Sequence, residues 1–307
     1  MSSLAELLAP LELDARHDLL QLHESGGLLT GLAETRFGET IQQIADDLGL
    51  SPVVRYAVPQ PAVAARRAAL LGAPLAAASQ LNEVLLGDQL EKLSSEAGFT
   101  LVRTLNDDYL GWLPDHVLVP GDYAASHTVT ALRAHAFAGP RVQSQRLLEL
   151  SWGERLKVVK EGLGDFSMVK LPDGRDAFVP ADALTEGVPA VSDDFEQNAR
   201  ALLHAPYVWG GNTAWGLDCS GFAQLIHAQA GNQLPRDADE QFRAGTVIDL
   251  AEARPGDAAC YRGHIGIITG KERMIHATAR GMRVREDHVF ATETLKESYL
   301  GTVRFGN

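Results

Sequence analysis

Apolar positions recur at helical spacing near the start of the chain. Ile41, Ile44 and Leu48 would share one face of a helix. Gly49 follows them, and glycine is a residue type that often ends a helix. We therefore expect residues 1–55 to be a helical segment that packs against or caps the rest of the molecule. No candidate chemistry lies in it.

The middle of the chain contains an internal repeat with an offset of 66 residues, which relates Gly87 to Gly153. In each copy, apolar and polar residues alternate over short runs that are broken by Gly, Asp and Pro. This pattern predicts small antiparallel β units with one face exposed. We expect two such units, a first repeat at about 56–121 and a second repeat at about 122–187.

A helix is expected near the start of the C-terminal part, which spans residues 188–307. Asp193 and Glu196 have the spacing of a capping box at a helix N-terminus. Phe195 and Ala199 begin an apolar stripe at helical spacing. With about 120 residues, this part is long enough to form a domain of its own.

Cys219 is predicted to lie at the N-terminus of a second helix. Residues 207–218 are aromatic residues, glycines and polar turn-formers and indicate a loop. After Cys219, Phe222 and Leu225 share a helix face, and Gly231 ends the pattern. The N–H groups and dipole of a helix N-terminus favour an anion, so we expect the thiol pKa to be lowered. The thiolate is the nucleophilic form of cysteine.

Two histidines are predicted to lie on neighbouring strands. Residues 254–270 indicate two strands around a turn, and His264 opens the second of them. Residues 273–279 indicate the next strand, which carries His276. In an antiparallel pair the two rings would be neighbours. His264 would then face the thiol of Cys219 while His276 holds the other ring nitrogen, as in a nucleophile–base–orienter triad.

The motifs of the C-terminal part resemble those of NlpC/P60 cysteine peptidases. Over about 195–307 the segments follow in that family's order and spacing: Y-V-W-G-G, D-C-S-G-F, P-R-D-A-D-E-Q, R-P-G-D, G-H-I-G-I and I-H-A. The resemblance implies an α+β, papain-like domain in which the helix carrying Cys packs on an antiparallel sheet. It also implies that Cys219, His264 and His276 are the catalytic triad.

The two repeats resemble bacterial SH3-type (SH3b) barrels, and the whole layout resembles γ-D-glutamyl-L-diamino-acid endopeptidases of the YkfC type. This resemblance implies a substrate that is a murein tripeptide or tetrapeptide with a free N-terminal L-Ala. Cleavage would release L-Ala-γ-D-Glu during recycling of the cell wall. The diamino acid at the third position and the oligomeric state are left open.

The same resemblance implies residues that bind the substrate amine. Asp237 would pair with the ammonium, and the first repeat would close that end of the cleft with Tyr109 and Glu83. Ordinary barrel packing is the alternative for Tyr109, and a solvated strand charge is the alternative for Glu83. The second repeat has Arg175 near the position that corresponds to Tyr109, so it lacks the aromatic ring.

Further site residues follow from the family pattern. Tyr207 is expected to donate its hydroxyl to the oxyanion together with the backbone N–H of Cys219. Trp209 is expected to form a wall of the cleft. For Asp218 and Ser220, helix capping and substrate binding are both open and are compatible. The second cysteine, Cys260, lies between apolar neighbours on an expected strand and is interpreted as buried and inert.

Composition narrows the classes of function. The formal net charge is −13, and an acidic surface repels phosphates, so we do not expect nucleic acid as a partner. The first residues lack the basic and apolar regions of a signal peptide, and no stretch is long enough for a membrane span, so a cytoplasmic protein is expected. Metal-ligand spacing is absent from the sequence, and neither a metal nor an organic cofactor is expected.

Two different classes of function are the alternatives. A cysteine acyltransferase on the same fold would carry the same triad. A non-catalytic wall-binding protein could use SH3b units as tethers, but the acidic charge would repel anionic wall polymer.

Overall fold

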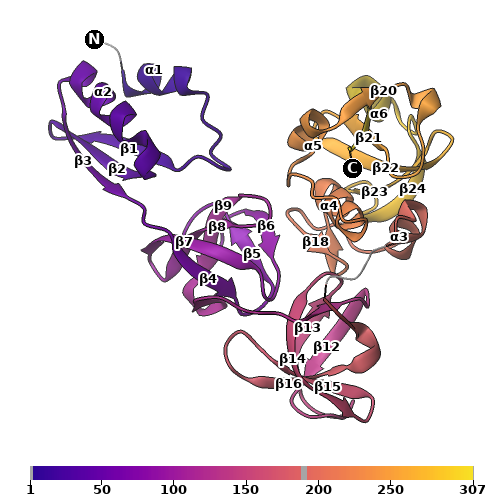
Figure 1. Cartoon of the computed structure of the whole chain (residues 1–307). Coiled ribbons are helices and arrows are strands. Elements are labelled where there is room, and N and C mark those ends of the chain that lie inside the picture. Colours follow the sequence, from indigo (N-terminus) through magenta and orange to yellow (C-terminus); the bar gives the residue numbers. More distant parts are fainter. Residues whose placement is uncertain (1–2, 188–191, 307) are drawn as a thin grey trace.

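The computed structural model describes residues 3–187 and 192–306, which form several β-sheets with short helices between them (Figure 1). From indigo to yellow in Figure 1, an N-terminal unit, two repeated β units and a C-terminal α+β unit follow one another. None of the described helices is long and apolar enough to cross a membrane.

The N-terminal unit is a three-stranded sheet with helices, so the expectation of a purely helical segment is wrong. Its elements are α1 (Leu4–Leu8), η1 (Ala9–Leu11), β1 (Leu20–Ser25), β2 (Leu28–Ala33), η2 (Thr35–Phe37), α2 (Gly38–Leu48) and β3 (Ser51–Tyr56). Helix α2 and its end at Gly49, which is left-handed, are confirmed. The apolar spacing in α2 does not predict the structure of the residues before it. There, Gly26 and Gly27, both with positive φ, form the turn of a β1–β2 hairpin. Helix α2 then connects β2 to the parallel strand β3.

The first repeat is a seven-stranded sheet in the order β10-β4-β7-β8-β9-β5-β6. Its strands and single short helix are β4 (Gln60–Ala64), β5 (Ala68–Leu71), β6 (Gln80–Val84), β7 (Gln89–Glu96), β8 (Phe99–Thr104), β9 (Leu110–Pro114), η3 (Asp115–Val117) and β10 (Leu118–Pro120).

The second repeat is also a seven-stranded sheet, in the order β13-β12-β16-β15-β14-β11-β17. Its elements are β11 (His127–Val129), β12 (Arg133–Phe137), β13 (Arg146–Ser151), β14 (Arg155–Leu163), β15 (Phe166–Lys170), β16 (Asp176–Pro180), η4 (Ala181–Ala183) and β17 (Leu184–Glu186). Strands β9 and β16 differ by the predicted offset of 66 residues at both ends, and so do β10 and β17.

The C-terminal unit is built on a six-stranded antiparallel sheet in the order β20-β25-β21-β22-β23-β24. The strands of the unit are β18 (Asn212–Thr213), β19 (Gly216–Leu217), β20 (Thr246–Ile248), β21 (Ala258–Tyr261), β22 (His264–Gly270), β23 (Arg273–Thr278), β24 (Arg283–His288) and β25 (Tyr299–Arg304). Its helices are α3 (Phe195–Ala201), α4 (Cys219–Gln229), α5 (Ala238–Ala244), η5 (Leu250–Glu252) and α6 (Glu293–Ser298).

Helix α4 packs on the sheet through apolar residues that are fully buried. Phe222 and Ile226 of the helix share one core with Ile265 and Ile267 of β22 and Ile275 of β23. Burial of this face holds the N-terminus of α4 beside the start of β22, since both ends of the contact are rigid elements. At the entry to the unit, Asp194 caps α3 by accepting from the N–H of Gln197. The expected cap at Asp193 is therefore off by one residue.

Apolar contacts also join the units. Leu19 and Leu32 of the N-terminal unit share a core with Leu101 and Trp112 of the first repeat. Trp152 of the second repeat packs against the core of the C-terminal unit. Apolar cores therefore join the first repeat to the N-terminal unit and the second repeat to the C-terminal unit.

Candidate active site

Cys219 is the first residue of α4, as the apolar spacing predicts. The preceding residue, Asp218, has an extended backbone and caps the helix by accepting from the N–H of Gly221 at 2.7 Å. Gly221 is required here because a Cβ at this position would lie 2.2 Å from the carbonyl oxygen of Gly211. The loop before the helix thus packs tightly on its first turn and fixes the position of the thiol.

The sulfur lies at a small cavity between two units of the chain. The cavity has a volume of about 220 Å³. Leu81 and Tyr109 of the first repeat line it, together with Tyr207, Cys219 and Asp237 of the C-terminal unit. Pockets that hold drug-sized ligands usually measure about 300–1,000 Å³, so this one suits a smaller group.

The thiol of Cys219 is protonated at neutral pH, which corrects the expectation of a lowered pKa. Burial, and next to it the charge of Asp218, raise the pKa of Cys219 to about 11. The backbone N–H groups of Ile265 and Ser220 and the charge of Arg236 act in the opposite direction and do not outweigh the burial. The helix N-terminus is present, but the thiol is only 8% exposed, and loss of water disfavours the thiolate.

The two histidines form a direct pair, as predicted from the strand pattern. Nε2 of His264 on β22 lies 2.7 Å from Nδ1 of His276 on β23. Nε2 of His276 lies 3.2 Å from Oδ2 of Asp287 on β24. Gly266 leaves room for this arrangement, because a Cβ there would lie 3.1 Å from Cβ of His276. Three successive strands of one sheet therefore carry a continuous polar chain.

The direction of the protons in this chain follows from its last member. Burial and the neighbouring His276 lower the pKa of His264 to about 3, and burial lowers the pKa of His276, so both rings are neutral at pH 7. A carboxylate only accepts, so Nε2 of His276 donates to Asp287. Nδ1 of His276 then accepts from Nε2 of His264, which leaves Nδ1 of His264 without a proton.

Cys219 and His264 are close in the fold but are not hydrogen-bonded to each other. The N–H of Ile265, the residue after His264, acts on the sulfur and favours its thiolate. Across residues 3–187 and 192–306, however, no hydrogen bond joins the sulfur to the ring, and His264 lines a separate cavity of about 480 Å³. Since the thiol and the ring are both neutral, no ion pair draws them together before substrate binds.

Arg236 holds the loops around Cys219 in place. Its side chain is fully buried and donates to both oxygens of Asp218, at 3.0 and 2.7 Å. It also donates to Oγ of Ser220 at 2.9 Å and to Oδ1 of Asn82 in the first repeat at 2.6 Å. Removing one partner of such a buried pair typically costs about 3–5 kcal/mol. Asp218 and Ser220 therefore have a structural role, and both also line the cavity.

Asp237 lies opposite Cys219 in the cavity wall and is bound from two other units. Oδ2 of Asp237 accepts from the hydroxyl of Tyr109 in the first repeat at 3.2 Å. The same oxygen accepts from Nη1 of Arg16 in the N-terminal unit at 3.0 Å. Asp237 and Tyr109 are thus brought together as the family resemblance implies. The arginine that also binds Asp237 was not foreseen.

Glu83 is not among the cavity-lining residues in the described part of the chain. It pairs with Arg67 at 3.0 Å and accepts from the N–H of Asn212 at 3.3 Å. The side chain of Asn212 donates to the backbone carbonyl of Glu83 at 2.9 Å. Glu83 therefore joins the first repeat to the loop before α4. Its side chain is largely buried and lies outside the lining of the cavity that contains Cys219.

Two aromatic residues of the loop before α4 line the cavity, as expected. Burial, and after it the nearby Cys219, raise the pKa of Tyr207 to about 12, so its hydroxyl keeps its proton and can donate. Trp209 is 67% exposed and forms the outer edge of the cavity. Cys260 is 1% exposed on β21, and burial raises its pKa to about 12, as expected for an inert thiol.

Three residues of the site were missed from the sequence. Arg236 lies inside the P-R-D-A-D-E-Q motif, and its burial beside Asp218 could have been suspected from that motif. Asp287 lies on the strand after His276, but Glu286 precedes it there, and the sequence does not show which of the two carboxylates contacts the ring. Arg16 is 221 positions from Asp237 and carries no local signal.

Comparisons with known proteins find relatives of the C-terminal unit and of most of the chain. Residues 204–304 match the model of the NlpC/P60 family. The chain is 28% identical over 219 residues to a γ-D-glutamyl-L-lysine dipeptidyl-peptidase of Bacillus cereus, covering 65% of each. It is 29% identical to the γ-D-glutamyl-L-lysine dipeptidyl-peptidase of Bacillus subtilis, covering 64% of this chain and 68% of the relative. The match thus spans about two thirds of the length of these relatives.

A solved structure shares the fold over most of the chain. It is an NlpC/P60 family protein from Bacillus cereus, with a TM-score of 0.70 and 22% identity, covering 80% of this chain and 99% of that one. The C-terminal unit is therefore an NlpC/P60 domain, and the chain is similar to γ-D-glutamyl-L-lysine dipeptidyl-peptidases. These similarities support the classification of the chain as a peptidase, which is a kind of hydrolase.

Proposed function

We propose that this protein is a cysteine peptidase that hydrolyses the γ-D-glutamyl-L-diamino-acid bond of murein-derived peptides. Its substrates would be tripeptides or tetrapeptides with a free N-terminal L-Ala, and the product would be L-Ala-γ-D-Glu. The observation that carries the proposal is the polar chain from Asp287 through His276 to His264, which ends beside the strand residue that contacts Cys219. The choice of this bond is supported by two relatives, which are named γ-D-glutamyl-L-lysine dipeptidyl-peptidases.

The first chemical step is attack by Cys219 on the γ-carbonyl of D-Glu. Because Nδ1 of His264 carries no proton, it accepts the proton of the thiol as the S–C bond forms. The negative charge moves to the carbonyl oxygen. Tyr207, which keeps its proton and lines the cavity, and the backbone N–H of Cys219 would donate to this oxygen.

The second step releases the diamino acid and then the dipeptide. The C–N bond breaks, and the imidazolium of His264 returns its proton to the leaving amine. L-Ala-γ-D-Glu remains bound to the sulfur as a thioester. Water attacks the thioester with His264 as base, so that the dipeptide carboxylate and the free thiol are formed. His276 orients His264 throughout and, together with Asp287, holds its tautomer.

Two residues of the cavity wall, Asp237 and Tyr109, support selection of a free N-terminus. Asp237 carries a negative charge there, and Tyr109 fills the space beside it. An ammonium would form a charge-assisted hydrogen bond with Asp237. An acylated amine would place a carbonyl against the carboxylate instead, and the polar groups left unpaired typically cost about 1–3 kcal/mol each.

Charge supports action on released peptides and not on intact wall. The formal net charge of −13 would repel anionic wall polymer. We therefore place the protein in the cytoplasm, in recycling of wall peptides, with the two repeats as SH3b-type units that shape the cavity. Domain limits at 56–121, 122–187 and 188–307 belong to the same proposal.

The test is a digest of synthetic L-Ala-γ-D-Glu-L-diamino-acid peptides with lysine, diaminopimelate or ornithine at the third position, read by mass spectrometry. The proposal predicts L-Ala-γ-D-Glu and the free diamino acid as products. A parallel digest contains a nucleophilic acceptor amine. Transfer of L-Ala-γ-D-Glu to the acceptor in preference to water would identify an acyltransferase. No cleavage, with binding to intact peptidoglycan, would identify a wall-binding protein.

A further inference from the structure

Arg16 connects the N-terminal unit to the wall of the cavity that contains Cys219. The residue lies before β1, and its Nη1 donates to Oδ2 of Asp237 at 3.0 Å and to Oδ1 of Asp239 at 2.8 Å. Its Nη2 donates to Asp14 of its own segment at 2.6 Å. Asp237 and Asp239 both line the cavity. A side chain from outside the NlpC/P60 domain therefore holds part of that domain's cavity wall.

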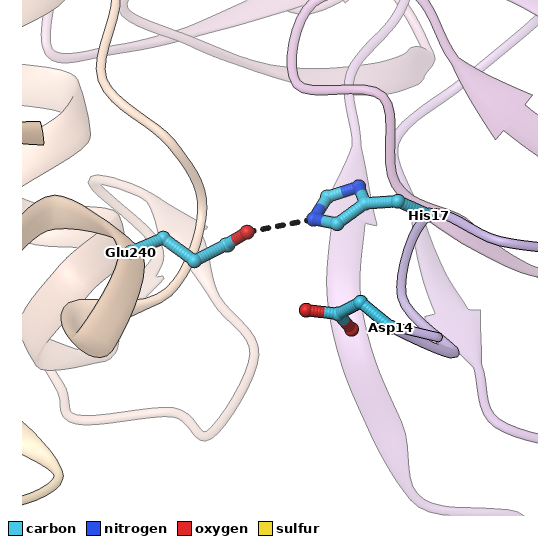
Figure 2. A group of neighbouring side chains, drawn as sticks. All are labelled: Asp14, His17 and Glu240. Carbon is cyan, nitrogen blue, oxygen red and sulfur yellow. Dashed lines mark hydrogen bonds and ion pairs between the residues drawn. The ribbon is translucent and has the colours of Figure 1, made fainter. Parts of the chain in front are cut away.

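His17 makes a second contact to α5, the helix that carries Asp239. Its Nδ1 donates to the carbonyl of Asp108 at 2.7 Å, and its Nε2 faces Oε1 of Glu240 at 2.7 Å (Figure 2). Since a carbonyl and a carboxylate only accept, both ring nitrogens carry protons. Burial alone would lower the pKa of His17, but these two hydrogen bonds and the charges of Glu240 and Asp14 together outweigh it, and the pKa is raised. Arg16 and His17 are thus adjacent cations of the N-terminal unit that contact acidic residues of α5.

Asp14, His17 and Glu240 lie close enough together to resemble a group of metal ligands (Figure 2). Each is already bound to a neighbour, however. Asp14 accepts from Nε and Nη2 of Arg16 at 2.9 and 2.6 Å, and Glu240 pairs with the protonated ring of His17 at 2.7 Å. These contacts explain the group as part of an interface between two units.

The first repeat fixes Arg16 from the other side. The N–H of Leu110 donates to the carbonyl of Arg16 at 2.7 Å, and Arg103 donates to the carbonyl of His17 at 2.8 Å. The ring of His17 packs edge-on against Tyr109, with 5.9 Å between centroids. Tyr109 and Arg16 both donate to Oδ2 of Asp237. One carboxylate oxygen is therefore the meeting point of three units.

We propose that Arg16 is a positioning residue that sets the preference of the cavity for peptides with a free N-terminus. The inference rests on the proposed function, in which Asp237 pairs with the substrate ammonium. Arg16 is not among the described residues that line the cavity, so it acts through Asp237. By holding Oδ2 of Asp237 against Tyr109, it presents the carboxylate to the amine in one orientation.

The charges around Arg16 support this role. Four carboxylates crowd at the start of α5 and in the adjacent turn: Asp14, Asp237, Asp239 and Glu240. The hydrogen bond from Arg16 is the main cause that lowers the pKa of Asp14 and of Asp239 to about 2 each. Arg16 thus relieves repulsion among groups that stay ionised. The acids still outnumber the two cations, so the end of the cavity keeps its attraction for an ammonium.

The experiment compares steady-state kinetics on L-Ala-γ-D-Glu-L-Lys and its N-acetyl form. Arg16→Ala should raise KM for the free-amine peptide about tenfold and change kcat by less than about twofold, because uniform binding is lost. KM for the acetylated peptide should stay within about twofold, so the selectivity falls. Arg16→Lys restores one ion pair but not the fork that reaches three carboxylates, and should give intermediate selectivity.

Two further variants separate positioning from general damage. Arg243→Ala removes another ion pair of Asp239, at 2.9 Å on the outer face of α5, and should leave selectivity unchanged. In an Asp237→Asn background, Arg16→Ala should have little further effect, because coupled residues are not additive.

Equal losses on both peptides, or full selectivity in Arg16→Ala, would overturn the inference while the proposed function stands. A wild-type protein that cleaves neither peptide, or cleaves both at the same rate, would overturn the proposed amine site itself, and the role of Arg16 with it. The control Arg243→Ala must match wild type for either conclusion.

Discussion

Nε2 of His264 lies 2.7 Å from Nδ1 of His276, and this contact determines which nitrogen of His264 is free to accept a proton. His276 faces Asp287 at 3.2 Å, and a carboxylate cannot donate. The proton pattern that starts at Asp287 therefore leaves Nδ1 of His264 as an acceptor. In this way Asp287 on β24 sets the tautomer of the ring of His264 at the start of β22.

Substitution at Asp287 tests this control. Asp287→Asn can donate its amide to His276, which would reverse the tautomers and protonate Nδ1 of His264. We expect kcat on the free-amine peptide to fall by about 10²-fold or more, because this is the size of the contribution that a general base typically makes. Asp287→Ala, which cannot donate, should be less damaging than Asp287→Asn. The control is Glu286→Gln on the same strand, which contacts Arg200 at 3.0 Å on the surface.

The two histidines should differ in their effect. His264→Ala should abolish nearly all turnover, because the thiol loses its base, whereas His276→Ala should retain more activity since it only orients the ring. Single-turnover rates at pH 7 measure both. Equal loss in the two variants would contradict the assignment of His264 as base. A larger loss in Asp287→Ala than in Asp287→Asn would contradict the tautomer argument.

The pH dependence of alkylation tests the state of the thiol. Because burial raises the pKa of Cys219 to about 11, iodoacetamide should label the free protein slowly at pH 7. The rate should rise about tenfold for each pH unit up to the pKa, since only the thiolate reacts. The measurement is done on Cys260→Ala, so that one thiol remains. A plateau of fast labelling between pH 5 and 7 would show instead that a thiolate–imidazolium pair exists before substrate binds.

Substrate selectivity tests the amine site directly. The N-acetyl tripeptide should be cleaved at least about tenfold more slowly than the free-amine form, because its carbonyl meets Asp237 without a partner. Asp237→Asn should narrow the gap by slowing the free-amine substrate alone. The measurement is kcat/KM on both peptides, for wild type and for Asp237→Asn. Equal rates on free, acetylated and polymer-linked peptides would indicate a general wall hydrolase.

A buried carboxylate in the second repeat predicts how stability changes with pH. Burial raises the pKa of Glu154 to about 8, although Leu86 and Ser151 donate backbone N–H groups to it. A raised pKa means that its contribution is present below the unfolded value near 4.5 and is lost as the pH rises through about 8.

Glu154→Gln should remove this loss while an oxygen acceptor is kept. Relative to the variant, wild type should lose up to about 1.4 kcal/mol of unfolding free energy per pH unit between pH 5 and 8. Urea unfolding at several pH values measures it. The control is Glu149→Gln, whose side chain is 49% exposed. Parallel pH curves for wild type and Glu154→Gln would contradict the raised pKa of Glu154.

Local patterns were enough to predict the elements that carry the triad. Helical spacing after Cys219 and the strand patterns around His264 and His276 are properties of neighbouring residues, and the elements were confirmed. Asp287 was missed because its contact with the ring of His276 depends on the β23–β24 register, in which Arg285 is paired with His276 and Asp287 with Met274. Register is set across strands and is not visible within one of them.

Burial and long-range contacts account for the other differences. The helix N-terminus at Cys219 was predicted, but the pKa of its thiol depends on how much of the group is covered, which local spacing does not reveal. In residues 1–55, α2 dominated the pattern, and the Gly26–Gly27 turn that forms the β1–β2 hairpin was overlooked. Arg16 meets Asp237 only because three units pack together.

The most direct test of the account is to trap the covalent intermediate. L-Ala-γ-D-Glu-L-Lys is mixed with the protein, the reaction is quenched in acid within the first turnover, and the mass is located by peptide mapping. The account predicts a thioester of L-Ala-γ-D-Glu on Cys219, absent in Cys219→Ala and unchanged in Cys260→Ala. Release of the dipeptide by the Cys219→Ala variant, or an adduct on Cys260, would contradict it.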